Sequence, residues 1–317
     1  MDQKEKKIEQ FKGQTRLPKF AVPKRYDLTL KPDLVDCTFS GSVQIEVTII
    51  EETSVLVLNV LELSIHESMF TDSYGKQYRP SDVVVDVDDE ILVLVFDDVL
   101  SVGNGVLEFK FSGVLNDYMK GFYRGTYLEG GEKKNMANTQ FEAVDARHCF
   151  PCWDEPALKA IFKVTLLVPS ELVALSNMPI SKEELNGHIK TVQFEESPLM
   201  STYLVAFVVG SFDYIEDKTA DGIKVCVYCP VGQRDRGRFG LSVALKALDF
   251  FGKFFSLPYP LPKLDMVAVP DFSAGAMENY GLIIYREAEL LHDDMHSATA
   301  CKQQLLHMKW LISGLAT

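Results

Sequence analysis

Short runs of β-branched and other apolar residues, separated by turn-forming residues, dominate most of the chain. Between residues 23 and 213, segments such as FSGSVQIEVTII, EILVLVF and GVLEFKFSGVL are rich in Val, Ile, Leu, Phe and Thr. Several of these segments alternate apolar with polar residues, and Gly, Asp, Asn or Pro separates them. No helical periodicity of any length appears in this region. The pattern predicts a mainly β fold, an antiparallel β-sandwich or saddle-like domain.

The apolar pattern changes near Gln233, which predicts a second domain. The segment RDRGRFGLSVALKALDFFGKFF carries apolar residues at helical spacing over 241–255, and Pro258 is expected to end this helix. KLDMVAVPDF then predicts a short strand, and GAMENYGLIIYRE predicts a turn followed by another strand. In SATACKQQLL, Ser297 is placed to cap the start of a further helix.

These patterns divide the chain into three parts. A chain of 317 residues is long enough for two domains with cores of their own. We expect a flexible tail over 1–16, a β-sandwich domain over 17–212 and an incomplete mixed α/β domain over 213–317. The sequence contains no internal repeat and no low-complexity segment.

The charge and hydropathy of the sequence limit which partners and which cellular compartment we expect for this protein. The formal net charge of -13 argues against nucleic acid as a partner, because binding phosphates requires a basic surface. An acidic chain suits cationic ligands such as free amino termini. The polar start of the chain lacks the apolar core of a signal peptide, and no apolar run reaches the length of roughly 20 residues that a membrane-spanning helix needs. We therefore expect a cytoplasmic protein.

Two pairs of cysteines have the C-x-x-C spacing of redox and zinc sites. Cys226 and Cys229 lie in IKVCVYCP, which alternates like a strand, so residues three apart face opposite sides. Cys149 and Cys152 are followed by WDEP rather than by a helix that would lower the pKa of a thiol. We interpret all four as structural cysteines.

Two acidic segments are candidates for a binding site. In the first, Gly275 begins the stretch GAMEN, whose single carboxylate is Glu278. The second, TQFEAVDARHCFPCWDEPALKA, holds several carboxylates among aromatic residues, and Glu142 lies between Phe141 and an alanine. Taken alone, Glu278 is a solvated surface residue by default, and the Asp-Glu pair before Pro156 reads equally well as a helix start.

The two segments resemble motifs of a known family. RLPKFAVPKRYDL, QFEAVDARHCFPCWDEP, STYLVAFVVGSF and GAMENYGLIIYRE occur in the order found in the zinc aminopeptidases of the aminopeptidase N and puromycin-sensitive group. The likeness covers residues 11–304 and is strongest to the plant aminopeptidase M-like members. One departure is Tyr280, where the family usually has Trp. The resemblance implies a saddle-like β-domain followed by a thermolysin-like catalytic domain.

The resemblance also implies substrate-binding roles. Residues matching Gln140, Glu142 and Glu278 line the S1 side of the site in the family, and the two carboxylates grip the protonated α-amine of the substrate by charge-assisted hydrogen bonds. The backbone of Gly275 and Ala276 would pair with the substrate like an added strand. The full set expected to bind substrate is Gln140, Glu142, Gly275, Ala276, Met277, Glu278 and Asn279.

Catalysis in this family also needs zinc, held by H-E-x-x-H on a helix. The 317 residues contain no such motif. His292 and His296 have the i, i+4 spacing of a zinc pair, but HDDMH lacks the glutamate, so we interpret them as surface residues. Codons that can encode 305–317 give VAHEVAHQWFGN in another frame, which predicts that 305–317 is an out-of-frame tail. The alternative is a skipped-exon joint.

The resulting hypothesis separates binding from catalysis. By family, the chain is related to zinc metallo-aminopeptidases that remove N-terminal residues from peptides. We expect no metal ligands, no bound zinc and no turnover in this chain, but retention of the residues that bind peptides with a free N-terminus. The alternative is a non-catalytic or regulatory fragment that pairs with a full-length enzyme. Peripheral attachment to microsomal membranes and homo-oligomerisation are left open.

Overall fold

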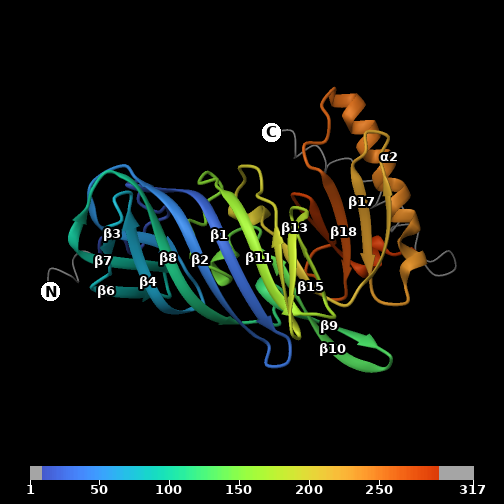
Figure 1. Ribbon diagram of the computed structural model, residues 1–317, viewed down its shortest axis with the longest axis horizontal. Helices are drawn as coiled ribbons and strands as arrows, with labels where there is room; N and C mark the ends of the chain where they lie inside the picture. Colours follow the sequence, from blue (N-terminus) through green and yellow to red (C-terminus); the bar gives the residue numbers. More distant parts are fainter. Residues whose placement is uncertain (1–8, 293–317) are drawn as a thin grey trace.

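The computed structural model describes residues 9–292, which are built mainly from β-strands in four sheets. Figure 1 shows the β-rich body on one side and α2 (Arg238–Phe255) with the last sheet on the other. Most neighbouring strands are antiparallel, so the expected mainly β fold is confirmed. One parallel pair in the body, between β1 (Ala21–Asp33) and β11 (Ile161–Pro169), was not expected from the sequence.

The largest sheet has eight strands and forms the long curved face of the body. Alternation along β1 buries Tyr26, Leu28 and Leu30 on one face, as the period of two requires. In spatial order, the strands are β13 (Ile180–Asn186), β14 (Ile189–Phe194), β11 (Ile161–Pro169), β1 (Ala21–Asp33), β2 (Thr38–Ile49), β8 (Gly103–Val114), β4 (Ser64–Asp72) and β5 (Gln77–Tyr78).

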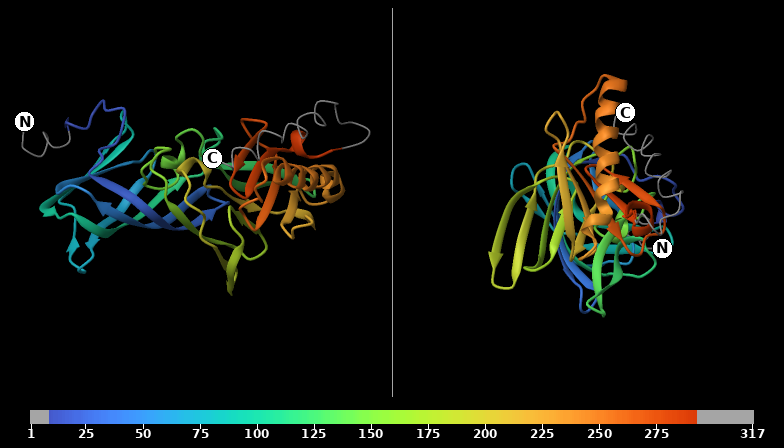
Figure 2. Two further views of the ribbon diagram at one scale, coloured as in Figure 1. Left: turned by 90° about the horizontal axis from the view of Figure 1, so that it is seen from above. Right: turned by 90° about the vertical axis from the view of Figure 1, so that its right-hand side faces the viewer.

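Two smaller sheets complete the body. One consists of β3 (Thr53–Asn59), β7 (Ile91–Leu100) and β6 (Asp82–Asp86). The other consists of β12 (Val173–Ser176), β15 (Phe207–Gly210), β10 (Glu132–Gln140) and β9 (Gly121–Glu129). One continuous apolar core joins these sheets to the eight-stranded sheet, and within it the rings of Tyr26 and Phe162 stack 4.9 Å apart. The β13–β14 hairpin stands out from the body (Figure 2).

The five-stranded sheet begins at Asp213, next to the domain boundary predicted at 212/213. Its spatial order is β16 (Asp213–Lys218), β17 (Lys224–Cys229), β18 (Lys263–Val269), β20 (Leu282–Arg286) and β19 (Ala276–Asn279). The central strands β17, β18 and β20 are parallel. All residues of β18 are buried because both faces of this sheet are covered, as is typical of parallel strands.

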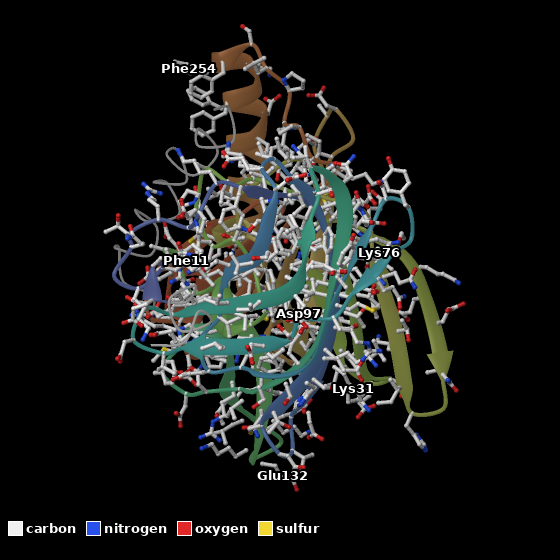
Figure 3. All side chains as sticks on the ribbon, turned by 90° about the vertical axis from the view of Figure 1, so that its left-hand side faces the viewer. Phe11, Lys31, Lys76, Asp97, Glu132 and Phe254 are labelled. Atoms are coloured by element: carbon white, nitrogen blue, oxygen red, sulfur yellow. The ribbon has the colours of Figure 1, made fainter. Side chains whose placement is uncertain are left out.

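Helix α2 covers one face of the five-stranded sheet through Ala244, Leu248 and Phe251. It begins three residues before the predicted 241–255 and ends where Ser256 adopts a left-handed conformation, ahead of Pro258. Figure 3 shows Phe254 near one end of α2, away from the sheets. The shorter helices are η1 (Ala146–His148), η2 (Thr202–Leu204), η3 (Arg234–Gly237) and α3 (Glu287–Leu290).

A third apolar cluster lies between the four-stranded and five-stranded sheets. It includes Tyr123 and Val208 from the first sheet and Val267, Met277 and Ile284 from the second. The two predicted domains therefore share a buried apolar interface, which fixes the position of β19 relative to β10.

Part of the predicted N-terminal tail lies against the body. The amide of Gly13 donates to Asp89, and Arg16 pairs with Glu155 at 3.0 Å. The ring of Phe11 packs against the main core. No helix within 9–292 is long and apolar enough to cross a membrane. The predicted helix at Ser297 and the predicted out-of-frame tail over 305–317 lie outside the described residues.

Candidate functional site

The GAMEN segment forms an edge strand rather than the predicted turn. Within 9–292, β19 pairs only with β20, from Ala276 opposite Tyr285 to Asn279 opposite Leu282. The turn comes later, at the two residues between these strands. The sequence analysis missed this because four residues around one carboxylate give no clear alternation until the buried partner strand is known.

Alternation along β19 separates its side chains into two faces. Met277 and Asn279 are buried, and Met277 belongs to the apolar cluster between the sheets. Ala276 and Glu278 are only half-buried and face the other side. Of the predicted binding residues on this strand, Glu278 therefore presents its side chain, whereas Met277 has its side chain in the core.

The loop before β19 is held by Arg286. Its amide donates to the carbonyl oxygen of Gly275 at 3.0 Å, and its guanidinium donates to the carbonyl oxygens of Phe272 and Ser273. The start of β19 is thus fixed from its own partner strand. The carbonyl oxygen of Gly275, predicted to pair with substrate, is therefore used by Arg286. Within 9–292, the outer edge of β19 has no partner strand, so its backbone from Ala276 onward can pair with an added strand.

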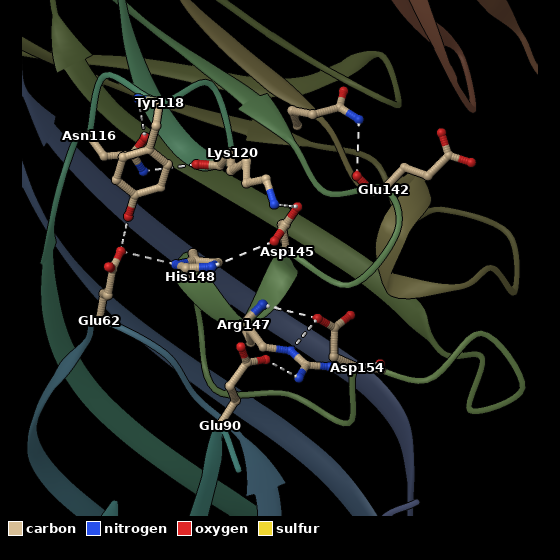
Figure 4. Close-up of polar contacts among 11 residues, drawn as sticks. Glu62, Glu90, Asn116, Tyr118, Lys120, Glu142, Asp145, Arg147, His148 and Asp154 are labelled. Atoms are coloured by element: carbon tan, nitrogen blue, oxygen red, sulfur yellow. Dashed lines mark hydrogen bonds and ion pairs between the residues drawn. The ribbon is translucent and has the colours of Figure 1, made fainter. Parts of the chain in front are cut away.

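Gln140 and Glu142 come from the other side of the domain interface. Gln140 is the last residue of β10, and its Nε2 donates to the carbonyl oxygen of Glu142 at 3.3 Å. The Oε1 atom of Gln140 is buried without a hydrogen-bond partner in the described part of the chain. The Glu142 side chain is exposed and points away from the neighbouring polar cluster (Figure 4). An unpartnered acceptor next to a free carboxylate is suited to a hydrogen-bond donor.

The charge of Glu142 acts on the carboxyl group of Glu278 across this interface. Burial is the main reason that the pKa of Glu278 is raised; a backbone hydrogen bond lowers it, and the charge of Glu142 is a smaller effect that raises it. Two carboxylates close enough to repel are stabilised by a cation placed between them. The site therefore favours a positively charged group with several N–H donors, and the partly buried position of Glu278 strengthens such a contact.

A buried ion pair fixes the loop that carries Glu142. The guanidinium of Arg147 donates to Asp154 Oδ2 at 3.1 Å and to Glu90 at 2.7 Å. The hydroxyl of Thr202 donates to the other oxygen of Asp154 at 2.6 Å. The next element after Asp154 is strand β11 and no helix begins at this point, so the helix-start interpretation is wrong, and the carboxylate is a core partner for Arg147. Sequence reasoning missed Arg147, although a buried carboxylate needs a cation nearby.

His148 makes a second anchor for the same loop (Figure 4). Its Nδ1 lies 3.2 Å from Glu62 Oε2, and its Nε2 lies 3.6 Å from Asp145 Oδ1. The hydroxyl of Tyr118 also donates to Glu62. These contacts connect the loop after β10 to the segment between β3 and β4, so the carboxylate of Glu142 is carried on a fixed backbone.

The cysteines behave as structural residues. Cys149 and Cys152 are fully buried, and burial raises the pKa of both thiols well above the usual value. In β17, burial likewise raises the pKa of Cys226 to about 12 and that of Cys229 to about 11. All four are free thiols, so the structural interpretation of both C-x-x-C pairs agrees with their surroundings.

The described residues do not fit a zinc site. Within 9–292, no group of three or more His, Cys, Asp or Glu side chains is arranged to hold a metal ion. His292 is half-buried, and its ring lies 5.2 Å from that of Phe239. His296 lies outside the described residues, so the interpretation of the pair as surface residues stays a prediction.

Comparison with models of protein families shows to which family the chain belongs. The model of the peptidase M1 N-terminal domain matches residues 22–204, which is more than half of the chain. The chain belongs to the M1 peptidase family. The peptidase family M1 domain matches residues 239–308, so the M1 match includes both Glu142 and Glu278.

Individual M1 relatives agree with this assignment. Aminopeptidase M1 of Arabidopsis thaliana is 60% identical over 301 residues, which is 94% of this chain and 34% of the relative. Aminopeptidase M1-B of Oryza sativa subsp. japonica is 58% identical over 94% of this chain and 34% of its own length. The puromycin-sensitive aminopeptidase of Caenorhabditis elegans is 42% identical over 92% of this chain and 31% of its own length. The chain thus spans about a third of the length of these relatives.

Proposed function

We propose that this chain binds the protonated N-terminus of peptides between Glu142 and Glu278, as the substrate-binding part of a zinc metallo-aminopeptidase. The single observation that supports the proposal is the electrostatic effect of Glu142, from the other side of the domain interface, on the half-buried carboxyl group of Glu278. The names of the M1 relatives point to the same substrate class.

The chemistry of the site favours an ammonium over other cations. An α-ammonium group carries three N–H donors, and it can satisfy Glu142, Glu278 and the unpartnered Oε1 of Gln140 at once. An N-acetylated peptide has one amide N–H and no charge, so it would leave the carboxylate repulsion in place. The site should therefore select peptides with an unblocked N-terminus, with the peptide backbone lying along the outer edge of β19.

Binding and hydrolysis are separate parts of the proposal. The 317 residues contain no H-E-x-x-H sequence, and those described do not form a zinc site. We therefore expect no zinc bound tightly by this chain and no release of amino acids from an aminoacyl reporter, even with zinc supplied. Zinc-dependent turnover by the purified chain would contradict this half of the proposal and leave the binding half standing.

Calorimetric titration of the 317-residue chain tests the binding half. We expect leucyl-glycinamide to bind, and its N-acetylated form to bind ~10-fold more weakly or not at all. Glu278→Gln and Glu142→Gln should each weaken the unblocked peptide by ~10-fold or more. The matched control is Glu132→Gln, an exposed glutamate at the start of β10, which should leave the affinity unchanged. Equal affinity for the blocked and unblocked peptides would refute the proposal.

The binding partners and the cellular location of the chain remain predictions. The net charge of -13 supports cationic ligands and no nucleic acid. A cytoplasmic location, peripheral attachment to microsomal membranes, homo-oligomerisation and pairing with a full-length enzyme stay predictions. Fractionation of cells and co-purification with the full-length relative are the measurements that test them.

A further inference from the structure

The turn that joins β19 to β20 is held by buried side chains from outside the hairpin. The carbonyl oxygen of Tyr280 accepts a hydrogen bond from Asn177 Nδ2 at 2.8 Å. The carbonyl oxygen of Gly281 accepts one from Lys263 Nζ at 2.8 Å. Both donors are almost fully buried, so neither bond competes with water. The strand that bears Glu278 is thus fixed at its end as well as at its start.

The ammonium of Lys263 uses all three of its N–H groups. Besides Gly281, it donates to the carbonyl oxygen of Ser176 at 2.7 Å and to Asp265 Oδ2 at 2.7 Å. Ser176 ends β12 of the four-stranded sheet, whereas Lys263 and Asp265 lie on β18 of the five-stranded sheet. A single buried cation therefore connects the two sheets to the turn after β19. Asp265 supplies the charge that a buried ammonium requires.

Asn177 makes the corresponding connection from the other sheet. Its Nδ2 donates to the carbonyl oxygen of Leu204 as well as to that of Tyr280, both at 2.8 Å. Its Oδ1 accepts from the amide of Ala206 at 2.9 Å. The side chain is therefore held in one orientation by η2 and by the residue that precedes β15, and it presents a fixed N–H to the turn.

The same four-stranded sheet carries Glu142. β12 pairs with β15, β15 pairs with β10, and the hydroxyl of Thr139 bridges the backbone of Phe207. β10 then ends at Gln140, which bonds the backbone of Glu142. A continuous path of backbone pairing and side-chain hydrogen bonds thus connects the backbone of Glu142 to the turn after β19 through Asn177.

The contacts of Gly281 show how closely the turn after β19 approaches the backbone of Asn177. A Cβ atom at this position would lie 2.1 Å from the carbonyl oxygen of Asn177, and the residue has φ of +70°. Only glycine combines this backbone conformation with this contact. The turn therefore rests directly on the backbone of the four-stranded sheet, with no side chain between them.

We propose that Lys263 and Asn177 are positioning residues that set the separation between the carboxylates of Glu142 and Glu278. They act on the site through the turn after β19 and do not touch the ligand. The inference deepens the proposed function, because the gap they set is the proposed ammonium site. The claim about the separation itself needs no ligand and is tested without one.

The test measures the electrostatic coupling between the two carboxylates in the 317-residue chain. With ¹³C-labelled glutamate, NMR titration gives the pKa of Glu278 with and without Glu142→Gln. In the unsubstituted chain, Glu142→Gln should lower the pKa of Glu278. In the background of Asn177→Ala or of Lys263→Met, the same substitution should lower it by less than half as much. Unchanged coupling in folded Asn177→Ala and folded Lys263→Met overturns the inference.

Matched controls distinguish a displaced turn from general loosening. Ser197→Ala removes a buried hydroxyl that bonds the amide of Phe162, far from the junction, and should leave the coupling intact. A loss of coupling in Ser197→Ala also overturns the inference.

Two glycine substitutions provide a second test in case Asn177→Ala and Lys263→Met fail to fold. Gly281→Ala should reduce the coupling by pushing the turn away. Gly130→Ala places alanine at φ of +60° with open space around it and should not change the coupling. An intact coupling in folded Gly281→Ala overturns the inference. Failure of leucyl-glycinamide to bind the unsubstituted chain would instead refute the proposed function and leave the positioning role in place.

Discussion

The Nε atom of Arg147 lies 3.1 Å from Asp154 Oδ2, and the two side chains are 10% and 1% exposed. This pair sits under the loop that carries Glu142. It connects η1, in the loop after β10, to the segment before β11, seven residues further along the chain. Both charges are buried, so removing Asp154 leaves the guanidinium of Arg147 with only Glu90, which is 38% exposed, as a counter-charge.

Asp154→Asn should therefore lower the free energy of unfolding by about 3–5 kcal/mol. The guanidinium of Arg147 would lose its buried counter-charge and keep only the more exposed Glu90, and the hydroxyl of Thr202 would lose a charged acceptor. Urea denaturation at neutral pH measures the change. The control is Glu67→Gln, whose partner Lys110 is 2.9 Å away in an exposed ion pair, and it should change stability by about 0–1 kcal/mol. Equal losses in the two variants would contradict the assignment of Arg147 and Asp154 as a core pair.

The raised pKa of Glu278 predicts a pH dependence of stability with a definite sign. A carboxyl that binds its proton more tightly when folded contributes stability that is present below its unfolded pKa of about 4.3 and is lost as pH rises through the folded pKa. Glu278→Gln has no ionisable carboxyl group at this position, so it does not lose this stability as the pH rises. The difference in unfolding free energy, variant minus unsubstituted chain, should therefore become more positive from acidic to neutral pH.

Glu216→Gln provides the opposite sign for comparison. The ammonium of Lys224 lowers the pKa of Glu216, so its contribution is present at neutral pH and is lost as pH falls. For this variant, the same difference should become more negative towards neutral pH. Parallel pH profiles for Glu278→Gln and Glu216→Gln would refute the raised pKa of Glu278.

Phenylalanines lie on both the buried and the exposed face of α2, and truncating them should lower the unfolding free energy by unequal amounts. Phe251 is 7% exposed and packs against the five-stranded sheet, whereas Phe254 is 68% exposed. Phe251→Ala should lower the unfolding free energy by about 3–5 kcal/mol, and Phe254→Ala by under ~1 kcal/mol. Thermal and urea denaturation of both variants check this. A larger loss for Phe254→Ala would show that the outer face of α2 is covered in solution.

The buried thiols predict slow alkylation in the native protein. Because burial raises the pKa of Cys149 and Cys152, the thiolate that reacts with iodoacetamide is scarce at both positions. At pH 8, both should react at least ~10-fold more slowly than half-buried Cys37. Mass spectrometry of peptides after timed alkylation measures the rates, with protein unfolded in guanidinium as the fully reactive reference. Fast labelling of Cys149 or Cys152 would reopen a redox role for this C-x-x-C pair.

Alternation and turn chemistry predicted most of the fold. The strands of the body, helix α2 and strand β18 follow from the spacing of apolar residues, because side-chain burial has the period of the local structure. The parallel pairing of β1 with β11 could not be predicted in this way. It depends on which distant strand completes the sheet, and periodicity carries no information about that choice.

The candidate site was only partly accessible to sequence reasoning. Glu142 and Glu278 were found by resemblance, but residue spacing alone did not place them together. Arg147, Asn177 and Lys263 were missed because a single polar residue in an apolar segment does not reveal its partner. The signal that could have found Lys263 is its position at i−2 from Asp265 in an otherwise apolar strand, where two opposite charges can share one face.

The apolar cluster between the four-stranded and five-stranded sheets has a consequence for how the site can change. Tyr123 and Val208 on one side and Met277 and Ile284 on the other exclude water from the same volume. Neither sheet can shift without opening voids along the whole contact, since close-packed interiors resist gradual sliding. The backbone segments that carry Glu142 and Glu278 therefore cannot be shifted by degrees to suit ligands of different bulk. At the proposed ammonium site, we expect selectivity to act as a threshold, with groups that fit accepted and larger ones refused.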